Sequence, residues 1–325
     1  MAQPLTATIM SRIAVCKVLL KARPTAGQLA DRLRAPVPDG LELYLDNRDL
    51  ATAEGMDGVV AALDACELPR GFTLLVEGPI RSLDGEFFDL SRDSEADREL
   101  SRRLIDLARR IGAVGANVHA IAPDIDPGSL TRYNRDAVLA RALVSTRFFA
   151  EFAQQQGVVP TVENMPPVLR MRESGFYYSS IGMPPRDLVE LATAVPGLGV
   201  IMDTSHAQLY LNARRGVQEH VDGLDVERLR RFLAEPGGPE TLEEYLELLG
   251  DTVVACHVSN ASGLLGEGLP YGRGDLDLDL VVPALAARAR YLVTETLESN
   301  PEQAVHMRDA QWRMLRALGR MKNEE

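Results

Sequence analysis

The sequence predicts a (β/α)8 barrel of the TIM type. Three observations support this fold class: apolar segments alternate with longer segments of helical periodicity, eight apolar segments can be counted, and helical segments follow them. Such alternation is typical of βαβ units around a parallel sheet, and eight units close into a barrel. A chain of 325 residues is long enough for one large barrel.

The predicted strands are short runs rich in Val, Ile and Leu. They cover residues 12–20, 41–45, 72–78, 115–121, 158–164, 198–204, 252–258 and 290–297. Two of the helical segments between them end on glycines, Gly112 and Gly157, as helices commonly do. The last segment follows an early proline and repeats its apolar residues at helical spacing, which predicts a closing eighth helix.

The domain organisation expected is a single barrel over residues 1–325, because no low-complexity tract or Pro/Gly/Ser linker divides the chain. Two connections are longer than a turn. One follows the fifth strand at about 165–185, and the other follows the sixth at about 209–239. In a barrel, loops that follow strands border the active-site face, so we expect both to shape a pocket.

Composition narrows the function classes. The formal net charge of -12 disfavours a non-specific hold on nucleic acid. Three cysteines without close pairing fit a reducing compartment, and no segment reaches the ~20 uncharged apolar residues of a membrane helix. We therefore expect a cytoplasmic protein that acts on a small molecule, with no membrane or nucleic-acid partner; both a monomer and a homo-oligomer remain open.

Polar residues gather where the predicted strands end, which in a barrel is one shared face. They are Glu77, His119, Glu163, Asn164, Asp203, His206, His257 and Glu295. Carboxylates and imidazoles brought together in a low-dielectric site repel one another unless a cation is present, so we expect one divalent metal ion. Oxygen and nitrogen ligands suit Mn, Co, Mg, Zn or Fe. The alternative is a metal-free binding barrel whose carboxylates are balanced by arginines.

Basic residues add weaker signals. The chain has only three lysines, and Lys17 lies inside a predicted strand, where it either points into the barrel towards an anionic substrate or faces solvent. Arg170 and Arg172 lie in the fifth loop, where they either bind a phosphate or carboxylate or are simply solvated. His220 and His306 are expected to be surface or packing residues.

Five motifs resemble those of a known superfamily. They are "VENMP" at 162–166, "MDTSHA" at 202–207, "CHVSN" at 256–260, "GRGDLDL" at 272–278 and "VTETLE" at 293–298. The chain is similar to the xylose isomerase-like TIM barrels, which include sugar (phosphate) isomerases, ketose epimerases, hydroxypyruvate isomerase, inosose dehydratase and endonuclease IV.

The resemblance implies a role for each residue that matches. Glu163, Asp203, His257 and Glu295 would hold the metal, and Glu163 and Glu295 would also be the catalytic acid and base. His206 would bind substrate. The sugar-binding branches often carry an arginine after that histidine, which suggests Arg214; we expect His119, Glu77, Asn164 and Lys17 to join it around the substrate.

The implied reaction is isomerisation or epimerisation of a small sugar, sugar phosphate or related polyhydroxy carbonyl compound. A metal chelated by carbonyl and hydroxyl oxygens acidifies the neighbouring C–H bond, and a glutamate removes the proton to give an enediolate. An inosose-type dehydratase shares this step. An endonuclease IV-like zinc phosphodiesterase is the other alternative, but its three-zinc site needs a histidine where this chain has Glu77, and an Asp-x-His pair near Glu267.

Overall fold

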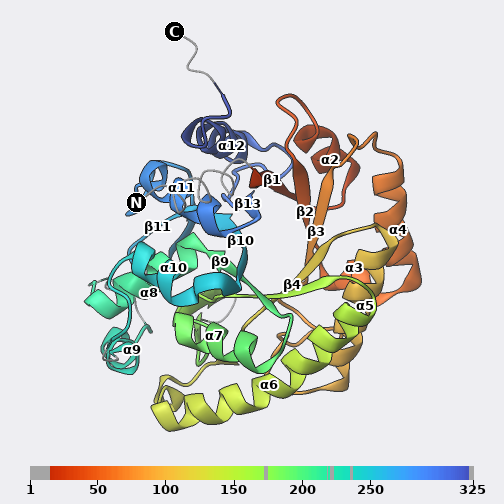
Figure 1. Cartoon of the computed structure of the whole chain (residues 1–325). Helices are drawn as coiled ribbons and strands as arrows, with labels where there is room; N and C mark the ends of the chain where they lie inside the picture. Colours follow the sequence, from red (N-terminus) through yellow and green to blue (C-terminus); the bar gives the residue numbers. More distant parts are fainter. Residues whose placement is uncertain (1–14, 172–174, 218, 220–222, 235–236, 322–325) are drawn as a thin grey trace, which may run out of the picture.

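Eight parallel strands form a closed barrel in the computed structural model, which describes residues 15–171, 175–217, 219, 223–234 and 237–321 (Figure 1). The strand order around the barrel is β1-β13-β10-β9-β6-β4-β3-β2. Chain neighbours lie side by side throughout, and the last barrel strand pairs with the first. The predicted fold class is therefore confirmed.

Each barrel strand overlaps a predicted one. The strands are β1 (Lys17–Ala22), β2 (Gly40–Tyr44), β3 (Thr73–Glu77), β4 (Gly115–His119), β6 (Val159–Glu163), β9 (Gly199–Asp203), β10 (Val253–Val258) and β13 (Tyr291–Thr294). Agreement is poorest at the first strand, which was predicted over 12–20 but runs on to Ala22. That shift brings Lys21 into the barrel wall.

At least one α-helix follows each barrel strand within the described residues, and these helices surround the sheet (Figure 1). They are α2 (Ala26–Arg32), α3 (Asn47–Ala51), α4 (Ala53–Asp64), α5 (Glu95–Arg110), α6 (Arg132–Gln155), α7 (Pro185–Ala194), α8 (Thr204–Arg215), α9 (Val226–Leu233), α10 (Leu242–Leu249), α11 (Leu278–Arg288) and α12 (Val305–Ala317). α5 illustrates the local causes. At the start of α5, the Ser94 side chain accepts a hydrogen bond from Asp97 N. In the last turn of α5, the positive charges of Arg109 and Arg110 interact favourably with the negative end of the helix dipole.

The barrel interior is layered because alternate residues of each strand point inwards. Leu19, Leu75 and Val293 form a small apolar cluster inside the barrel, separate from the large core between sheet and helices. The residues two positions further along these strands are Lys21, Glu77 and Glu295. The interior therefore changes from apolar in the middle to charged at the ends of the strands.

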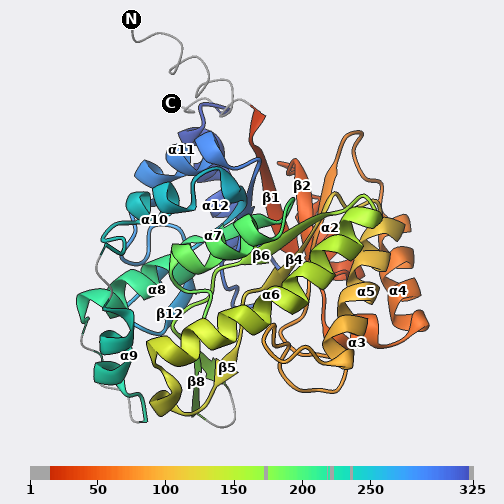
Figure 2. The ribbon, with the colours of Figure 1, turned by 60° about the horizontal axis from the view of Figure 1, so that its bottom comes forward.

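Additional elements gather at the end of the barrel where the strands terminate (Figure 2). The connection after β6 contains a hairpin of β7 (Val168–Met171) and β8 (Gly175–Ser179), and β8 also pairs with β5 (Pro123–Asp124). Another hairpin, β11 (Asn260–Ser262) and β12 (Gly266–Leu269), follows β10. A short 3-10 helix, η1 (Pro127–Ser129), lies in the connection after β4. A second, η2 (Gly250–Thr252), directly precedes β10 and so lies at the opposite end of the barrel.

The connection predicted at about 209–239 after the sixth strand needs a correction. Its first residues are helical, since α8 begins directly after β9 and continues to Arg215, and α9 occupies Val226–Leu233. The sequence at the start of this stretch lacks a clear division into an apolar and a polar face, because α8 is buried on almost every side. Across the described residues, no helix combines the length and apolarity needed to cross a bilayer.

Candidate metal centre

Four side chains from neighbouring strand ends converge inside the barrel. Glu163 ends β6, Asp203 ends β9, His257 lies near the end of β10, and Glu295 follows β13 directly. One oxygen or nitrogen of each lies within 4.8 Å of those of the other three. The first three residues are buried and the Glu295 side chain is 27% exposed, so the cluster opens to solvent on the Glu295 side.

His257 contacts both glutamates through one ring nitrogen. Its Nδ1 is 3.2 Å from Glu163 Oε1 and 2.5 Å from Glu295 Oε2. Its Nε2 is 2.7 Å from Glu42 Oε2, in the opposite direction. One ring nitrogen thus belongs to the four-residue cluster, and the other faces a carboxylate deeper in the barrel.

Asp203 has two structural tasks at the junction of β9 and α8. Its side chain caps α8 by accepting a hydrogen bond from His206 N at 2.7 Å, which places the next polar residue one helical turn away. The Asn164 side chain forms two hydrogen bonds with the Asp203 backbone: its Oδ1 accepts from Asp203 N at 2.6 Å, and its Nδ2 donates to Asp203 O at 3.1 Å. Asn164, predicted to bind substrate, therefore holds Asp203 in place in this structure.

His206 is brought to the edge of the cluster. Its Nδ1 lies 2.8 Å from the Asn164 carbonyl oxygen and 3.6 Å from Glu163 Oε1. Its Nε2 lies 3.2 Å from Glu267 Oε1 in β12. Burial lowers the pKa of His206, but Asp203 and Glu267 outweigh it and raise the pKa well above its ordinary value.

Glu77 and His119 line the side of the cluster reached by β3 and β4. His119 Nε2 is 3.5 Å from Glu77 Oε1 and 3.9 Å from Glu163 Oε2. Burial, only partly offset by Glu163, lowers the pKa of His119, so its imidazole is neutral. Asn117, which lies in β4 like His119, donates a hydrogen bond to Glu163 Oε2 at 2.6 Å and holds that carboxylate in place.

Lys21 is a site residue that the sequence analysis missed. Its Nζ is 2.5 Å from Glu77 Oε2 and is also paired with Glu295 Oε1. It was missed because the first strand was predicted to end at Leu20. The alternation of Lys17, Leu19 and Lys21, in a chain with only three lysines, was the signal that could have found it.

Lys17 lies on the inward side of β1 but at the opposite end from the cluster. Its Nζ donates to Gly71 O at 3.1 Å and to Thr73 Oγ1 at 2.7 Å. Since β1 begins at Lys17, this ammonium is placed at the mouth where the strands start. The structure does not bring it near the proposed substrate site.

Arg214 makes its contacts away from the cluster. Arg214 at the end of α8 donates to Leu233 O at 2.9 Å and pairs with Glu240 Oε1 at 3.2 Å, so it joins α8 to the segment around α9 and α10. Arg170 lies in β7, and His306 is half-buried on α12. Arg172 and His220 lie outside the described residues.

The carboxylates of the cluster differ in pKa. Burial raises the pKa of Glu163, but His257 and His119 outweigh it and bring it to about 2. Burial likewise opposes ionisation of Glu295, but His257 and Lys21 hold its pKa well below the usual range. Burial, partly offset by His206, raises the pKa of Asp203 to about 6. Both glutamates are therefore ionised at neutral pH.

These residues fit a divalent cation. Glu163 Oε1, His257 Nδ1 and Glu295 Oε2 are buried atoms with no hydrogen-bond partner, and all three belong to the four-residue cluster. Unpaired buried polar atoms are costly unless a ligand satisfies them. Three carboxylates and one imidazole suit Mn, Co, Mg, Zn or Fe.

Comparison with known proteins places the fold. The family described as Xylose isomerase-like TIM barrel matches residues 39–316. The chain belongs to this family. Among curated proteins, no sequence matches the chain.

Solved structures of similar fold cover nearly the whole chain. A D-tagatose 3-epimerase-like protein shares 15% identity at a TM-score of 0.61, covering 93% of this chain and 98% of its own. The 3-keto-D-glucoside 4-epimerase from E. coli shares 16% at 0.60, covering 94% and 100%. A Thermus thermophilus protein soaked with ZnCl2 shares 20% at 0.60, also covering 94% and 100%. At these identities, the similarity shows that the chain shares the fold of these proteins.

Proposed function

We propose that the protein is a divalent-metal-dependent isomerase or epimerase of a small sugar, sugar phosphate or related polyhydroxy carbonyl compound. The observation that carries this proposal is the convergence of Glu163, Asp203, His257 and Glu295, each contributing one atom to a cluster within 4.8 Å. The sugar epimerases of similar fold support the substrate class.

Glu163, Asp203, His257 and Glu295 would hold the metal. A bound divalent ion would act as a Lewis acid on the substrate carbonyl and lower the pKa of the adjacent C–H bond. Both glutamates contact Nδ1 of His257, and each has its own support: Asn117 holds Glu163, and Lys21 holds Glu295. Each is ionised, so either can accept the substrate proton and the other, or the same one, can return it.

Other residues would orient the substrate. His206 and His119 are buried beside the glutamates, and each has an imidazole nitrogen within 4 Å of a Glu163 oxygen. Glu267, from the hairpin after β10, faces His206 on the more exposed side. We assign these three side chains to hydrogen bonds with substrate hydroxyls, and we do not place Lys17 or Arg214 among them.

Exchange of the substrate α-proton with solvent deuterium tests the proposal. Glu163→Gln and Glu295→Gln each preserve side-chain shape but remove the base, so exchange should fall by roughly 10²- to 10⁴-fold. Glu54→Gln, an exposed position at the start of α4, is the control and should exchange normally. Full exchange by both site variants would show that the two glutamates are not the acid and base.

Two alternatives use the same frame. A dehydratase would also exchange the α-proton but would release water and lose a hydroxyl, which product analysis detects. A three-zinc nuclease is less well supported, because Lys21 lies between Glu77 and Glu295, where its charge opposes an additional cation. Metal analysis distinguishes the classes: the proposal expects one ion per chain, the nuclease two or three, and a metal-free binding barrel none.

A further inference from the structure

A further buried carboxylate, Glu42, lies deeper in the barrel than the four-residue cluster. Glu42, in the middle of β2, is completely buried, and its Oε2 is 2.7 Å from His257 Nε2. Among the described residues, both Glu42 oxygens and His257 Nε2 lack a hydrogen-bond partner, and a proton on Nε2 at this distance would supply a donor to Glu42. A buried carboxylate without a donor is strongly destabilising, so this contact determines where the His257 proton belongs.

The opposite side of the same ring faces the proposed metal ligands. His257 Nδ1 points towards Glu163 and Glu295, and a histidine binds a metal through an unprotonated nitrogen. A proton on Nε2 leaves Nδ1 with a free lone pair. Hydrogen bonds from the outer nitrogen to a carboxylate commonly set both the tautomer and the ring orientation of metal-binding histidines.

We infer that Glu42 is a positioning residue: it holds His257 as the Nε2–H tautomer and aims Nδ1 at the metal. This inference rests on the proposed function and extends it to a residue outside the four ligands. The contact joins β2 to β10 across the barrel interior. The shorter path between these strands runs through β1 and β13, the first and last barrel strands of the chain, so the contact requires barrel closure.

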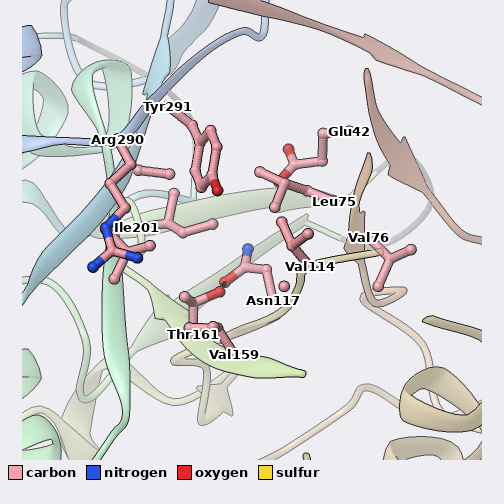
Figure 3. A pocket seen from close by; sticks show the side chains of 13 residues that line it. Glu42, Leu75, Val76, Val114, Asn117, Val159, Thr161, Ile201, Arg290 and Tyr291 are labelled. Carbon is pink, nitrogen blue, oxygen red and sulfur yellow. Dashed lines mark hydrogen bonds between the residues drawn. The ribbon is translucent and has the colours of Figure 1, made fainter. Parts of the chain in front are cut away.

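A cavity beneath this contact leaves room for further donors to Glu42. Glu42 lines a cavity of about 110 Å³ together with Leu75, Asn117, Thr161 and Tyr291 near the N-terminal mouth of the barrel (Figure 3). One water needs only roughly 10–15 Å³ of such space, so the cavity is large enough for ordered water that donates to the carboxylate. Asn117, which donates to Glu163, lines the same cavity.

Mn²⁺ affinity, measured by isothermal titration calorimetry, tests the inference in three variants. Glu42→Leu should weaken Mn²⁺ binding by roughly 10- to 100-fold, the range typical when a group behind a metal ligand is removed. Glu42→Gln should lose less, because its amide oxygen still accepts from Nε2–H. Leu75→Val changes the same cavity without touching His257, and should bind Mn²⁺ within about threefold of the wild type.

The tautomer provides a second readout, which does not depend on activity or on metal uptake. Long-range ¹H–¹⁵N NMR of the metal-free and Zn²⁺-loaded proteins should show His257 protonated on Nε2 in the wild type, and a changed Nε2 signal in Glu42→Gln. Wild-type Mn²⁺ affinity in Glu42→Leu, or His257 protonated on Nδ1 alone in the wild type, would overturn the inference while leaving the isomerase proposal intact. A wild-type protein that takes up no divalent ion would instead remove the proposed function, and the Nε2 signal of the metal-free protein would still decide whether Glu42 accepts a hydrogen bond from Nε2–H.

Discussion

Replacing Lys21 by methionine should destabilise the metal-free protein strongly. The Lys21 side chain is 9% exposed, and its ammonium group is the cation shared by Glu77 and Glu295. Methionine fills a similar volume but removes the ammonium partner of Glu77 and leaves Glu295 paired with His257 alone. Removing one member of a buried ion pair typically costs about 3–5 kcal/mol, because the remaining charge is still buried.

The expected change can be measured by thermal unfolding of the metal-free protein. At about 2.1 cal/mol/K of unfolding entropy per residue, a chain of 325 residues loses roughly 1.5 °C of Tm per kcal/mol. Lys21→Met should therefore lower Tm by roughly 4–8 °C. Adding Glu77→Gln should recover part of the loss, since it removes the carboxylate whose ammonium partner is lost.

Lys17→Met is the matched control on the same strand. Among the residues that the structure describes, Lys17 donates only to the neutral acceptors Gly71 O and Thr73 Oγ1 near the barrel mouth, so its loss leaves no buried charge there. We expect it to cost about 1–2 kcal/mol. Equal destabilisation by the two variants, or no recovery in the Lys21→Met/Glu77→Gln double variant, would refute the assignment of Lys21 as counter-ion of the site.

Three further predictions concern metal binding and the backbone. Metal affinity should fall continuously as the pH drops from about 7 to about 5. A bound ion must displace a proton from His257, because Glu163 and Glu295 outweigh burial and raise the pKa of His257 well above its ordinary value, and below about pH 6 it must also displace the proton that Asp203 holds with a pKa of about 6; calorimetry that finds constant affinity over this range would contradict this. Asp203→Asn should keep the α8 cap and nearly normal stability but bind Mn²⁺ more weakly than the wild type, by more than roughly 10-fold. Asp203→Ala should in addition lose about 1 kcal/mol of stability, because it also removes the cap. Wild-type Mn²⁺ affinity in Asp203→Asn would remove Asp203 from the ligand set. Gly182→Ala should lower the free energy of unfolding, measured in urea, more than Gly112→Ala does. Both glycines have positive φ, +81° and +70°, but a Cβ at Gly182 would overlap the Ala120 carbonyl oxygen, whereas the space around Gly112 is open. Equal losses in the two variants would show that the clash is relieved.

Much of the fold could be predicted because its signals are local. Each barrel strand is a short apolar run and each helix carries its own periodicity, so the order of elements is visible without any knowledge of contacts. Boundaries were less certain, as β1 shows: the apolar run ends at Leu20, but barrel closure extends the strand to Ala22. The helical start of the segment after β9 was hidden because α8 is buried on nearly all sides.

The candidate metal centre was predictable for the same reason. Parallel strands that close into a barrel bring their carboxyl ends to one face, so polar residues at strand ends must meet there. Glu163, Asp203, His257 and Glu295 do so in the structure. Their assignment as metal ligands stays a proposal that metal analysis tests.

What the sequence by itself determined is the barrel and the strand ends that converge on one face, since both follow from periodicity along the chain. Tertiary structure alone decided the partners of those residues. Lys21 and Glu295 are separated by 274 positions, and Glu42 meets His257 only across the barrel interior. The direction of Arg214, away from the cluster and towards Glu240, depends equally on how the helices pack. Such contacts are set by barrel closure and register, which no local pattern of residues encodes.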